Sequence, residues 1–432
     1  MRIHESVECS KSEIDLFSVP PTQTSIQEGF YDDIPADNSF NSSATIRIGV
    51  SGDSTHYLNL SEFEIIIQGY ICKIGDEGVA DTKKISVVND LLGSLFKQAE
   101  IGFNNKTVEN TNDLYPYRDY ITKTLGLSAQ QKKSQLAGSL YYKDDPEKFN
   151  TCLIGANELK NSGFISRRTA ILGKKIIELQ GKLSCDVFNI NHLLVPSVNV
   201  EVKLTKNDPK FYMLGDDAQG FYFNYTSVFL RIKRHIISPS VMEAHALLAE
   251  TTSYKYPLRR IVAKHTVTPY GAVKFSLTGI CKGIMPRRVI VGFVKNSAYD
   301  GEIKENPFEF QNILLKNISL KINSKSLPHS DGYSLDYAKG VILNGYRSLS
   351  KLFPDLDVTL DEYKNGYSLY SFDLNPDNGS CSHYSLLKDG QLDMDVSIER
   401  PLDSAYTVIF LCEFDNVIEI DRNRQINFDY IA

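Results

Sequence analysis

Two eight-residue segments that lie 219 residues apart share one pattern, and this pattern limits the possible folds more than any other feature of the chain. Residues 101–108 read IGFNNKTV, and residues 320–327 read LKINSKSL. Each has apolar residues around an Asn, a small polar residue, a Lys and a hydroxyl-bearing residue. This arrangement is typical of a β-hairpin with a short turn. Repeats of about 20–50 residues indicate a solenoid, whereas this spacing indicates a duplicated domain.

Other landmarks fall near the same spacing. The strand expected from Thr45 is matched by one near Lys264, and residues 63–71 correspond roughly to residues 287–295. A segment with aromatic residues and helical periodicity follows each hairpin, at residues 113–126 and at 334–350. Eight loosely matched positions could arise by chance, so the duplication depends on all of these landmarks together.

The rest of the chain is rich in strand patterns and poor in helical ones. Its 24 tyrosines and 22 phenylalanines, with no tryptophan, also favour β structure. Helices are expected at residues 113–126, 239–251 and 334–350, and a short helix or turn at residues 87–98. Strands are expected at residues 45–50, 63–71, 168–172, 176–183, 198–204, 220–232, 262–267, 272–277, 289–294, 313–323, 367–372, 392–398, 406–413 and 417–420. The expected fold class is all-β: a double jelly roll, which is two eight-stranded antiparallel β-sandwiches in tandem, with short helical insertions.

Three regions are expected along the chain. Residues 1–40 are acidic and contain Pro20 and Pro21, so we predict an extended arm and not a packed element. Residues 41–250 should form the first jelly roll and residues 251–432 the second. Within the first, residues 127–165 are polar and too long for a simple connection, which predicts a surface-exposed insertion.

Composition and charge exclude several classes of protein. The chain has 432 residues, 42% hydrophobic content and a net charge of −6, so it is unlike a protein that coats nucleic acid. The first 17 residues contain no apolar segment typical of a secretory signal, and no run approaches the roughly 18 apolar residues that span a bilayer. Seven dispersed cysteines without a CxxC pair indicate reduced thiols inside a cell. We therefore expect a protein that is neither secreted nor membrane-spanning.

Several further segments carry a resemblance to a known family. They are EIDLF at 13–17, PPTQTSI at 20–26, NDLYPYRDY at 112–120, PSVMEAH at 239–245, VGFVKNSAYDG at 291–301, NPF at 306–308, YAKGVILNGY at 337–346 and NGYSLYSFDL at 365–374. Together they resemble the hexon-like major capsid protein of Polinton/Maverick elements and the related adintoviruses. The segments span nearly the whole chain in the family's order. None is a catalytic signature, so the specificity of the resemblance comes from their number and order.

The resemblance implies an adenovirus-hexon-type capsid protein. Such a chain forms a homotrimer with a pseudo-hexagonal outline, and these capsomers tile an icosahedral shell around double-stranded DNA. The implied partners are neighbouring capsomers, a single-jelly-roll penton protein, a maturation protease and a packaging ATPase. The implied location is the virion, after synthesis inside the host cell and assembly in its nucleus or cytoplasm. The arm would reach under a neighbouring subunit. No catalytic residues and no cofactor are implied.

Motifs for chemistry are weak or incomplete. Residues 373–379 begin like a calcium loop, but the glycine comes one position late and Tyr384 stands where a Glu is needed, so a turn is the better interpretation. Cys381 and His383 share a strand face with nothing to orient them for nucleophilic catalysis. The eight histidines show no ligand spacing. We predict no catalytic, cofactor-binding or metal-binding residues.

Three short basic clusters allow two interpretations. They could be solvated strand ends or inter-subunit salt bridges. They could also form a positive inner face that contacts the phosphates of packaged DNA without base specificity. The residues of these clusters are Arg231, Lys233, Arg234, Arg259, Arg260, Arg287 and Arg288.

Two alternatives from other functional classes stay open. A double-jelly-roll enzyme acting on carbohydrate or peptide needs paired carboxylates or a histidine-based metal site. A glycan-binding protein needs an aromatic platform at a loop edge, which the absence of tryptophan weakens. The sequence offers neither pattern convincingly.

Overall fold

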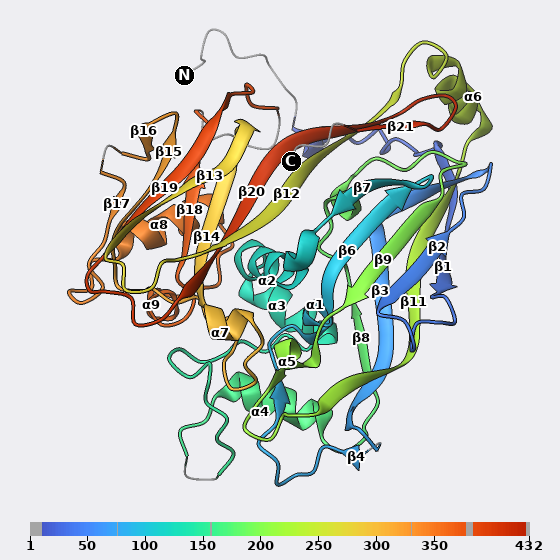
Figure 1. The fold of residues 1–432 in the computed structure, drawn as a ribbon. Coiled ribbons are helices and arrows are strands. Elements are labelled where there is room, and N and C mark those ends of the chain that lie inside the picture. Colours follow the sequence, from blue (N-terminus) through green and yellow to red (C-terminus); the bar gives the residue numbers. More distant parts are fainter. Residues whose placement is uncertain (1–10, 76, 156–157, 330, 377–382, 429–432) are drawn as a thin grey trace.

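The computed structural model describes residues 11–75, 77–155, 158–329, 331–376 and 383–428. Its strands form two groups that lie side by side, with the helices α1, α2 and α3 between them (Figure 1). The named strands up to Ile237 pair only with one another, and so do the named strands from Tyr254 onward. The predicted boundary between residues 250 and 251 falls in the connection between these groups, after α6.

Eight strands of the first group form two four-stranded antiparallel layers. One layer has the order β1 (Ile26–Pro35), β11 (Phe221–Ile237), β3 (His56–Lys73) and β8 (Ile177–Gly181). The other has the order β2 (Thr45–Val50), β9 (Val200–Lys206), β6 (Phe96–Phe103) and β7 (Lys106–Asn110). Numbered along the chain, these strands run 1-8-3-6 in one layer and 2-7-4-5 in the other. This is the arrangement of a jelly roll.

The second group repeats this topology. One layer has the order β12 (Tyr254–Val267), β20 (Tyr406–Ile420), β14 (Arg288–Lys295) and β18 (Leu369–Asp373). The other has the order β13 (Lys274–Ile284), β19 (Asp389–Ile398), β15 (Leu315–Ile322) and β16 (Lys325–Leu327). The predicted fold class, two eight-stranded antiparallel sandwiches in tandem, is therefore confirmed.

Shorter elements decorate this frame. The additional strands are β4 (Glu77–Gly78), β5 (Ser86–Val87), β10 (Met213–Leu214), β17 (Tyr333–Ser334) and β21 (Ile426–Phe428). The α-helices are α1 (Leu91–Ser94), α2 (Tyr115–Gly126), α3 (Ala129–Ser134), α4 (Ser162–Ile171), α5 (Pro209–Tyr212), α6 (Pro239–Leu248), α7 (Asn296–Tyr299), α8 (Leu343–Leu352) and α9 (Leu360–Lys364). The 3-10 helices are η1 (Ser12–Ile14), η2 (Asn112–Leu114), η3 (Ala137–Ser139) and η4 (Asp186–Asn189).

The repeated segment forms the same hairpin in both jelly rolls. The turn between β6 and β7 has Asn104 and Asn105 at φ 45° and 65°, and the turn between β15 and β16 has Asn323 and Ser324 at φ 48° and 69°. Two successive residues with positive φ are typical of a type I′ hairpin turn, and Asn tolerates this conformation better than most residues. The sequence pattern and its 219-residue spacing thus correspond to a true structural repeat.

One of the supporting landmarks is wrong. Residues 63–71 lie in β3 and residues 287–295 cover β14, and these strands hold the same place in their jelly rolls. Thr45 begins β2, whose counterpart is β13, but Lys264 lies in β12, the counterpart of β1. The error arose because β1 had been assigned to the arm, which left the first jelly roll one strand short.

The predicted arm is partly a strand. β1 pairs with β11 from Ile26, opposite Ile237, to Pro35, opposite Phe229. The first jelly roll therefore begins at Ile26 and not at residue 41. The strand was not predicted because it contains acidic residues and most of its residues are exposed. It is held at the edge of its sheet by backbone hydrogen bonds to β11, which need no alternating apolar pattern in the sequence. Residues 11–25, the described part of the arm before β1, are exposed throughout.

Two predictions for the segment before β8 also need correction. Residues 168–172 are not a strand, because α4 runs through to Ile171 and is capped by the Asn161 side chain, which accepts hydrogen bonds from two backbone N–H groups. The prediction that the insertion at residues 127–165 is surface-exposed is wrong in part, because exposed residues alternate with buried ones along it. Its buried side chains include Leu136, Leu140, Tyr141 and Phe149.

Helices predicted elsewhere are present but shorter. Of the short helix or turn expected at residues 87–98, only α1 is helical, because β6 begins at Phe96. The one expected at residues 334–350 begins later, as α8. The Asp373–Gly379 turn lies partly outside the described residues, and Cys381 lies entirely outside them.

Candidate functional site

The predicted basic residues of β11 lie beside carboxylates of the first jelly roll. Arg231 donates to both oxygens of Asp33, at 2.8 Å each. Arg234, which is buried, lies 3.2 Å from Asp32 and 3.2 Å from Asp53. The hydrogen bonds from Arg231 hold the pKa of Asp33 below its usual value. This cluster is therefore largely neutralised within the chain, by the β1 strand that the sequence analysis had placed in the arm.

The basic residues of the second jelly roll face acidic residues of β20. Arg287 is only 5% exposed and lies 2.8 Å from Asp415 and 3.6 Å from Glu413. Arg259 lies 3.7 Å from the same Glu413. The positive charges of Arg259 and Arg287 are therefore already paired with carboxylates of the same chain.

The three remaining basic residues have other surroundings. Lys233 lies 5.2 Å from the ring centre of Tyr31, and the buried Arg260 lies 5.3 Å from that of Phe428. Arg288 is half-buried, and its Nε has no hydrogen-bond partner among the described residues. Three of the seven residues lie in the first jelly roll and four in the second. Their contact with DNA stays a prediction.

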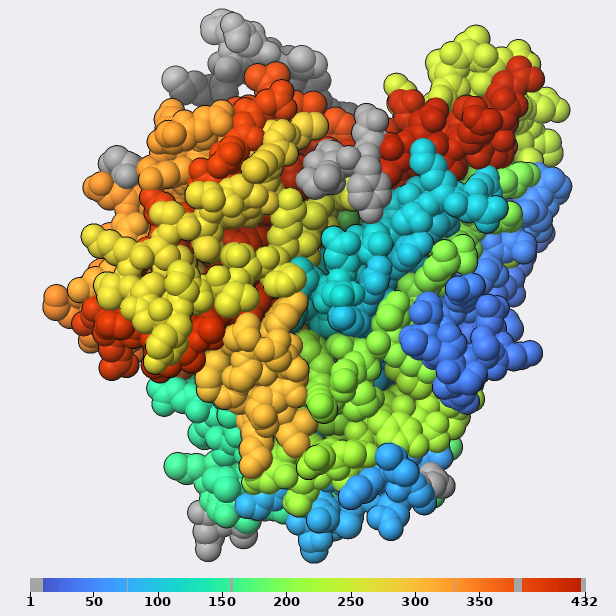
Figure 2. All heavy atoms as spheres, in the orientation of Figure 1, coloured from blue at the N-terminus to red at the C-terminus, as the bar shows by residue number. Residues whose placement is uncertain are grey.

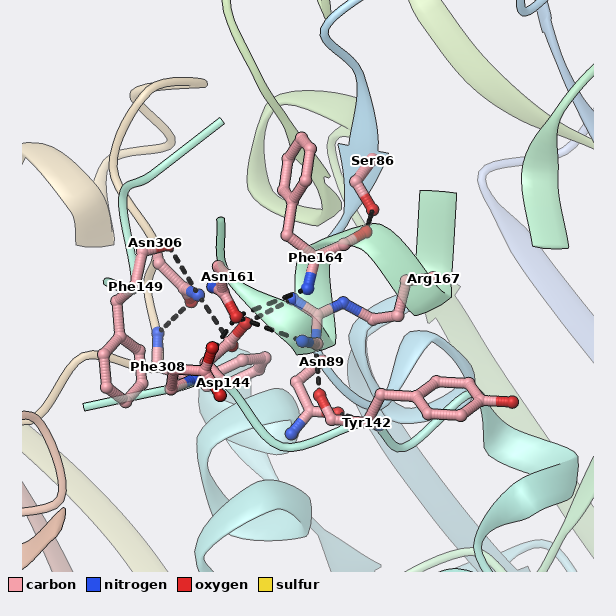
Figure 3. Close-up of polar contacts among 12 residues, drawn as sticks. Ser86, Asn89, Tyr142, Asp144, Phe149, Asn161, Phe164, Arg167, Asn306 and Phe308 are labelled. Carbon is pink, nitrogen blue, oxygen red and sulfur yellow. Dashed lines mark hydrogen bonds and ion pairs between the residues drawn. The ribbon is translucent and has the colours of Figure 1, made fainter. Parts of the chain in front are cut away.

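A buried carboxylate, Asp144, connects the insertion to the second jelly roll (Figure 3). Its Oδ1 accepts hydrogen bonds from Arg167 Nη2 at 2.6 Å and from Asn161 Nδ2 at 2.8 Å. Its Oδ2 accepts a hydrogen bond from Asn306 Nδ2 at 3.1 Å, and Asn306 lies in the loop that precedes β15. A charge without solvent needs such compensation, because an unpaired buried ion costs several kcal/mol.

Arg167 is itself fully buried, and each nitrogen of its guanidinium group donates a hydrogen bond. Its Nε donates to the carbonyl oxygen of Val87 at 2.8 Å, and its Nη1 donates to that of Tyr142. Figure 3 shows the guanidinium group lying between α4 and the segment that carries Tyr142 and Asp144. The insertion is therefore fixed at a defined position.

A second buried network crosses from the first jelly roll to β12. Arg118 of α2 is 1% exposed and lies 2.7 Å from Asp186 and 2.8 Å from Glu109. Its Nη1 donates to the carbonyl oxygen of Ile261 at 3.2 Å, and the Ile261 N–H donates to Asp186 Oδ2 at 2.9 Å. Because the N–H and the carbonyl group of Ile261 are both hydrogen-bonded to this network, β12 is held at one position against the first jelly roll.

A third buried group lies inside the first jelly roll. Lys123 of α2 donates to Asp90 at 2.8 Å and to Asp119 at 2.7 Å. One cation between two carboxylates leaves a net negative charge. Burial raises the pKa of Asp119 from 3.8 to about 7, the Asp90 carboxylate adds to this shift, and Lys123 opposes it.

The insertion also meets the helices of the second jelly roll near the surface. Lys143 lies 2.8 Å from Glu362 of α9, and Lys132 lies 3.5 Å from Asp357. Burial lowers the pKa of Lys132 to about 8. These pairs show how a polar segment can be partly buried: some of its charges have partners on the other jelly roll.

A cavity of about 710 Å³ adjoins the Arg118 network. Leu127, Leu136 and Leu183 of the first jelly roll and Ile261 of β12 contribute apolar walls. Its two acidic residues are engaged: Asp186 by Arg118, and Glu64 by Gln180 Nε2 at 2.7 Å. This lining offers no free carboxylate pair.

Two further searches concern the described residues only. In this part of the chain, no group of three or more His, Cys, Asp or Glu side chains is arranged to hold a metal ion. No helix in it is both long and apolar enough to cross a membrane.

The sequence analysis missed these junction residues as functional candidates. Arg118 lies in the segment at 112–120, and Asn306 lies in the segment at 306–308. Both segments contributed to the family resemblance. The resemblance therefore pointed to these residues, but it did not indicate that they are buried or that they join the two jelly rolls. Nothing local marks Asp144 or Arg167 as buried.

Comparisons with known proteins were made for the whole chain. No family model matches it. A Caenorhabditis elegans protein described as "Uncharacterized protein F54H12.2" is 22% identical, over 96% of this chain and 100% of that protein. A chain of the Sputnik virophage structure covers 99% of this chain and 93% of its own length, with a TM-score of 0.69 and 11% identity.

Two further solved structures have similar scores. The mavirus major capsid protein has a TM-score of 0.57 and 12% identity, covering 100% of this chain and 97% of its own. The Faustovirus major capsid protein has a TM-score of 0.56 and 8% identity, covering 95% and 93%. The chain has the double-jelly-roll fold of viral major capsid proteins. At these identities the likeness establishes the fold alone.

The Asp144 network predicts a large penalty for breaking one buried ion pair. The Asp144→Asn substitution keeps the shape but leaves Arg167 without its counter-charge, so the free energy of unfolding should fall by about 3–5 kcal/mol. Urea unfolding measures this change. Asp355→Asn, at an exposed carboxylate, is the matched control and should change stability by less than about 0.5 kcal/mol. Equal effects of the two substitutions would contradict the role of Asp144 in this double jelly roll.

The raised pKa of Asp119 predicts a pH dependence of defined sign. Between about pH 4 and pH 7 the folded chain binds a proton at Asp119 that the unfolded chain has lost, so this contribution to stability falls as pH rises. The slope is at most about 1.4 kcal/mol per pH unit. Asp119→Asn cannot titrate, so unfolding free energies measured at several pH values should show the wild type losing stability relative to the variant. A difference independent of pH would refute the shift, and Asp361→Asn serves as an exposed control.

Proposed function

We propose that this protein is the major capsid protein of an icosahedral virus particle, acting as a homotrimeric capsomer with a pseudo-hexagonal outline. The observation that carries the proposal is the fixed pairing of two jelly rolls with one topology in a single chain. The Sputnik virophage chain shares this arrangement over 99% of the present chain. Three such chains supply six jelly rolls, which suit a ring of hexagonal outline.

The buried junction supports this role physically. A shell needs subunits that hold one shape, because each capsomer meets its neighbours at fixed angles. Separating the partners of a buried ionic network leaves an uncompensated charge, which is costly, so such networks resist displacement. The Arg118 and Asp144 networks would therefore hold the two jelly rolls in one relative orientation.

An asymmetry between the two repeated hairpins supports assembly with further copies. The β6–β7 tip, although Asn105 and Lys106 are exposed, is tied to the C-terminal segment of the second jelly roll by two hydrogen bonds: Asn104 Nδ2 donates to the carbonyl oxygen of Arg424 at 3.0 Å, and Lys106 Nζ donates to that of Ile426 at 2.8 Å. The equivalent β15–β16 tip, Asn323 to Lys325, is exposed. In a ring of alternating jelly rolls, the first jelly roll of the next chain would cover it.

Helix α6 is the segment of the first jelly roll suited to this contact. It follows β11, as the C-terminal segment follows β20. None of its side chains is buried, and Leu247 and Leu248 are 67% and 62% exposed. Figure 2 shows α6 projecting at one corner of the molecule beside the C-terminal strands. Exposed apolar side chains gathered in this way mark interaction surfaces.

The finer assignments are part of the same proposal. Membership among the capsid proteins of Polinton/Maverick elements and adintoviruses is supported by the sequence segments and their order. A penton protein with a single jelly roll, contact with packaged double-stranded DNA and location in the virion follow from that role. In it the chain is a building block and not an enzyme.

The proposal is tested on the purified full-length chain. Light scattering and negative-stain electron microscopy should show particles of three times the chain mass of 48.6 kDa, with a hexagonal outline. A monomer that persists at high concentration would overturn the proposal. Hydrolysis or binding of glycans by such a monomer would favour the alternative classes.

The contact proposed for α6 is tested by placing charge on it. The double substitution Leu247→Asp and Leu248→Asp should weaken the trimer at least about tenfold, because two carboxylates would have to be desolvated at the interface. The unfolding temperature of the monomer should change little, since both side chains are exposed. Ile74→Asp, at a residue 84% exposed in the β3–β4 turn, is the matched control. An unaltered dissociation constant for the double variant would exclude α6 while leaving the capsid role intact.

A further inference from the structure

We propose that Cys281 and Cys412 form an intramolecular disulfide bond when the folded protein meets hydrogen peroxide. The bond would join the two sheets of the second jelly roll. This inference concerns the chemistry of the chain itself and holds whether or not the protein builds a shell.

The two thiols face one another across the core. Cys281 lies in β13 of one sheet, Cys412 lies in β20 of the other, and their sulfur atoms are 3.6 Å apart. Both side chains are buried, at 1% and 0% exposure. Two sulfurs in van der Waals contact need to approach to about 2.05 Å for a bond, which asks for a small side-chain movement. Of the five described cysteines, only these two have sulfur atoms in contact with each other.

The position of Cys281 gives a small reagent a route to this pair. β13 is an edge strand, hydrogen-bonded to β19 on one side only. Its register shifts between Leu277 and Cys281, and Gly279 and Gly283 have φ of 69° and 85°. A bulged edge strand with two glycines in the left-handed region opens at a lower free energy than a central strand such as β20. Cys281 is thus the sulfur that reagents reach first.

The electrostatic surroundings give the two sulfurs different roles. The hydrogen bond with Cys412 lowers the pKa of Cys281, and the nearby Lys264 ammonium adds to this, while burial opposes it. The same hydrogen bond and burial raise the pKa of Cys412 well above its usual value. Cys281 is therefore the nucleophile and Cys412 the resolving thiol.

The chemistry balances with peroxide as the oxidant. The Cys281 thiolate attacks one peroxide oxygen, the O–O bond breaks, and the leaving hydroxide takes up a proton to become water. This leaves a sulfenic acid on Cys281. The Cys412 sulfur, giving up its proton, then attacks the Cys281 sulfur and displaces the hydroxyl group as a second water. Two thiols are oxidised and one peroxide is reduced.

The bond would close a large loop. Cys281 and Cys412 are 131 residues apart, so the cross-link restricts most of the second jelly roll in the unfolded state. If the proposed capsid role holds, a shell that has left a reducing cell would gain this cross-link in every subunit.

The test is made on the wild-type, full-length chain in its folded state. After treatment with peroxide, remaining thiols are alkylated in denaturant and the protein is digested for mass spectrometry. We expect a peptide pair linked through Cys281 and Cys412, a mass lower by two hydrogens, and free thiols reduced from seven to five. The unfolding temperature should rise by about 5–10 °C and return to its starting value with dithiothreitol.

Variants separate this cross-link from other oxidation. Cys281→Ser and Cys412→Ser should each abolish both the linked peptide and the rise in unfolding temperature, whereas Cys72→Ser should keep both. The wild-type peptide map needs no variant, so it remains decisive if a serine variant fails to fold. Recovery of both cysteines as alkylated thiols, or a link that appears only after unfolding in urea, would overturn the proposal.

Discussion

The arrangement of the two jelly rolls depends on charged side chains that are buried between them. Each jelly roll has its own pair of sheets, and among the described residues no named strand of one jelly roll pairs with a strand of the other. The contacts that join the halves include those of Arg118 and Asp186 with Ile261 and of Asp144 with Asn306, beside stacked aromatic rings such as Tyr120 and Phe308. Buried ions lose their compensation when they move, so these contacts add to the constraint that the close-packed rings impose. The junction therefore determines the geometry more than it adds stability.

The insertion at residues 127–165 shows how this junction is built. It supplies Asp144 to the buried network and Lys143 to the ion pair with Glu362. A polar segment can thus pack between the two sandwiches, because its charged side chains pair with polar residues of the second jelly roll. In the cavity beside Arg118, Asp186 serves as a counter-ion and Glu64 accepts a hydrogen bond from the Gln180 amide.

The fold could be predicted where the signals are local. The alternating pattern and the Asn-centred turn are contained in eight residues, so the hairpins at Asn104 and Asn323 and the duplication were found from sequence. β1 was missed because its partner, β11, lies far along the chain and because Glu28, Asp32 and Asp33 give it an acidic character. The burial of Asp144 and Arg167 was missed for a related reason. A charge looks solvated in sequence until the fold brings its partner to it.

The connection of the two jelly rolls in one chain, through α6, affects how a capsid built from such chains would assemble. In a ring of three chains, every second contact between jelly rolls is made within a chain and is present before any encounter. Two domains joined by a short connection face each other at an effective concentration on the order of millimolar, independent of how dilute the protein is. Duplication in one chain would thus convert a six-body assembly into a three-body one. It would also ensure that the two kinds of jelly roll are always supplied in equal numbers.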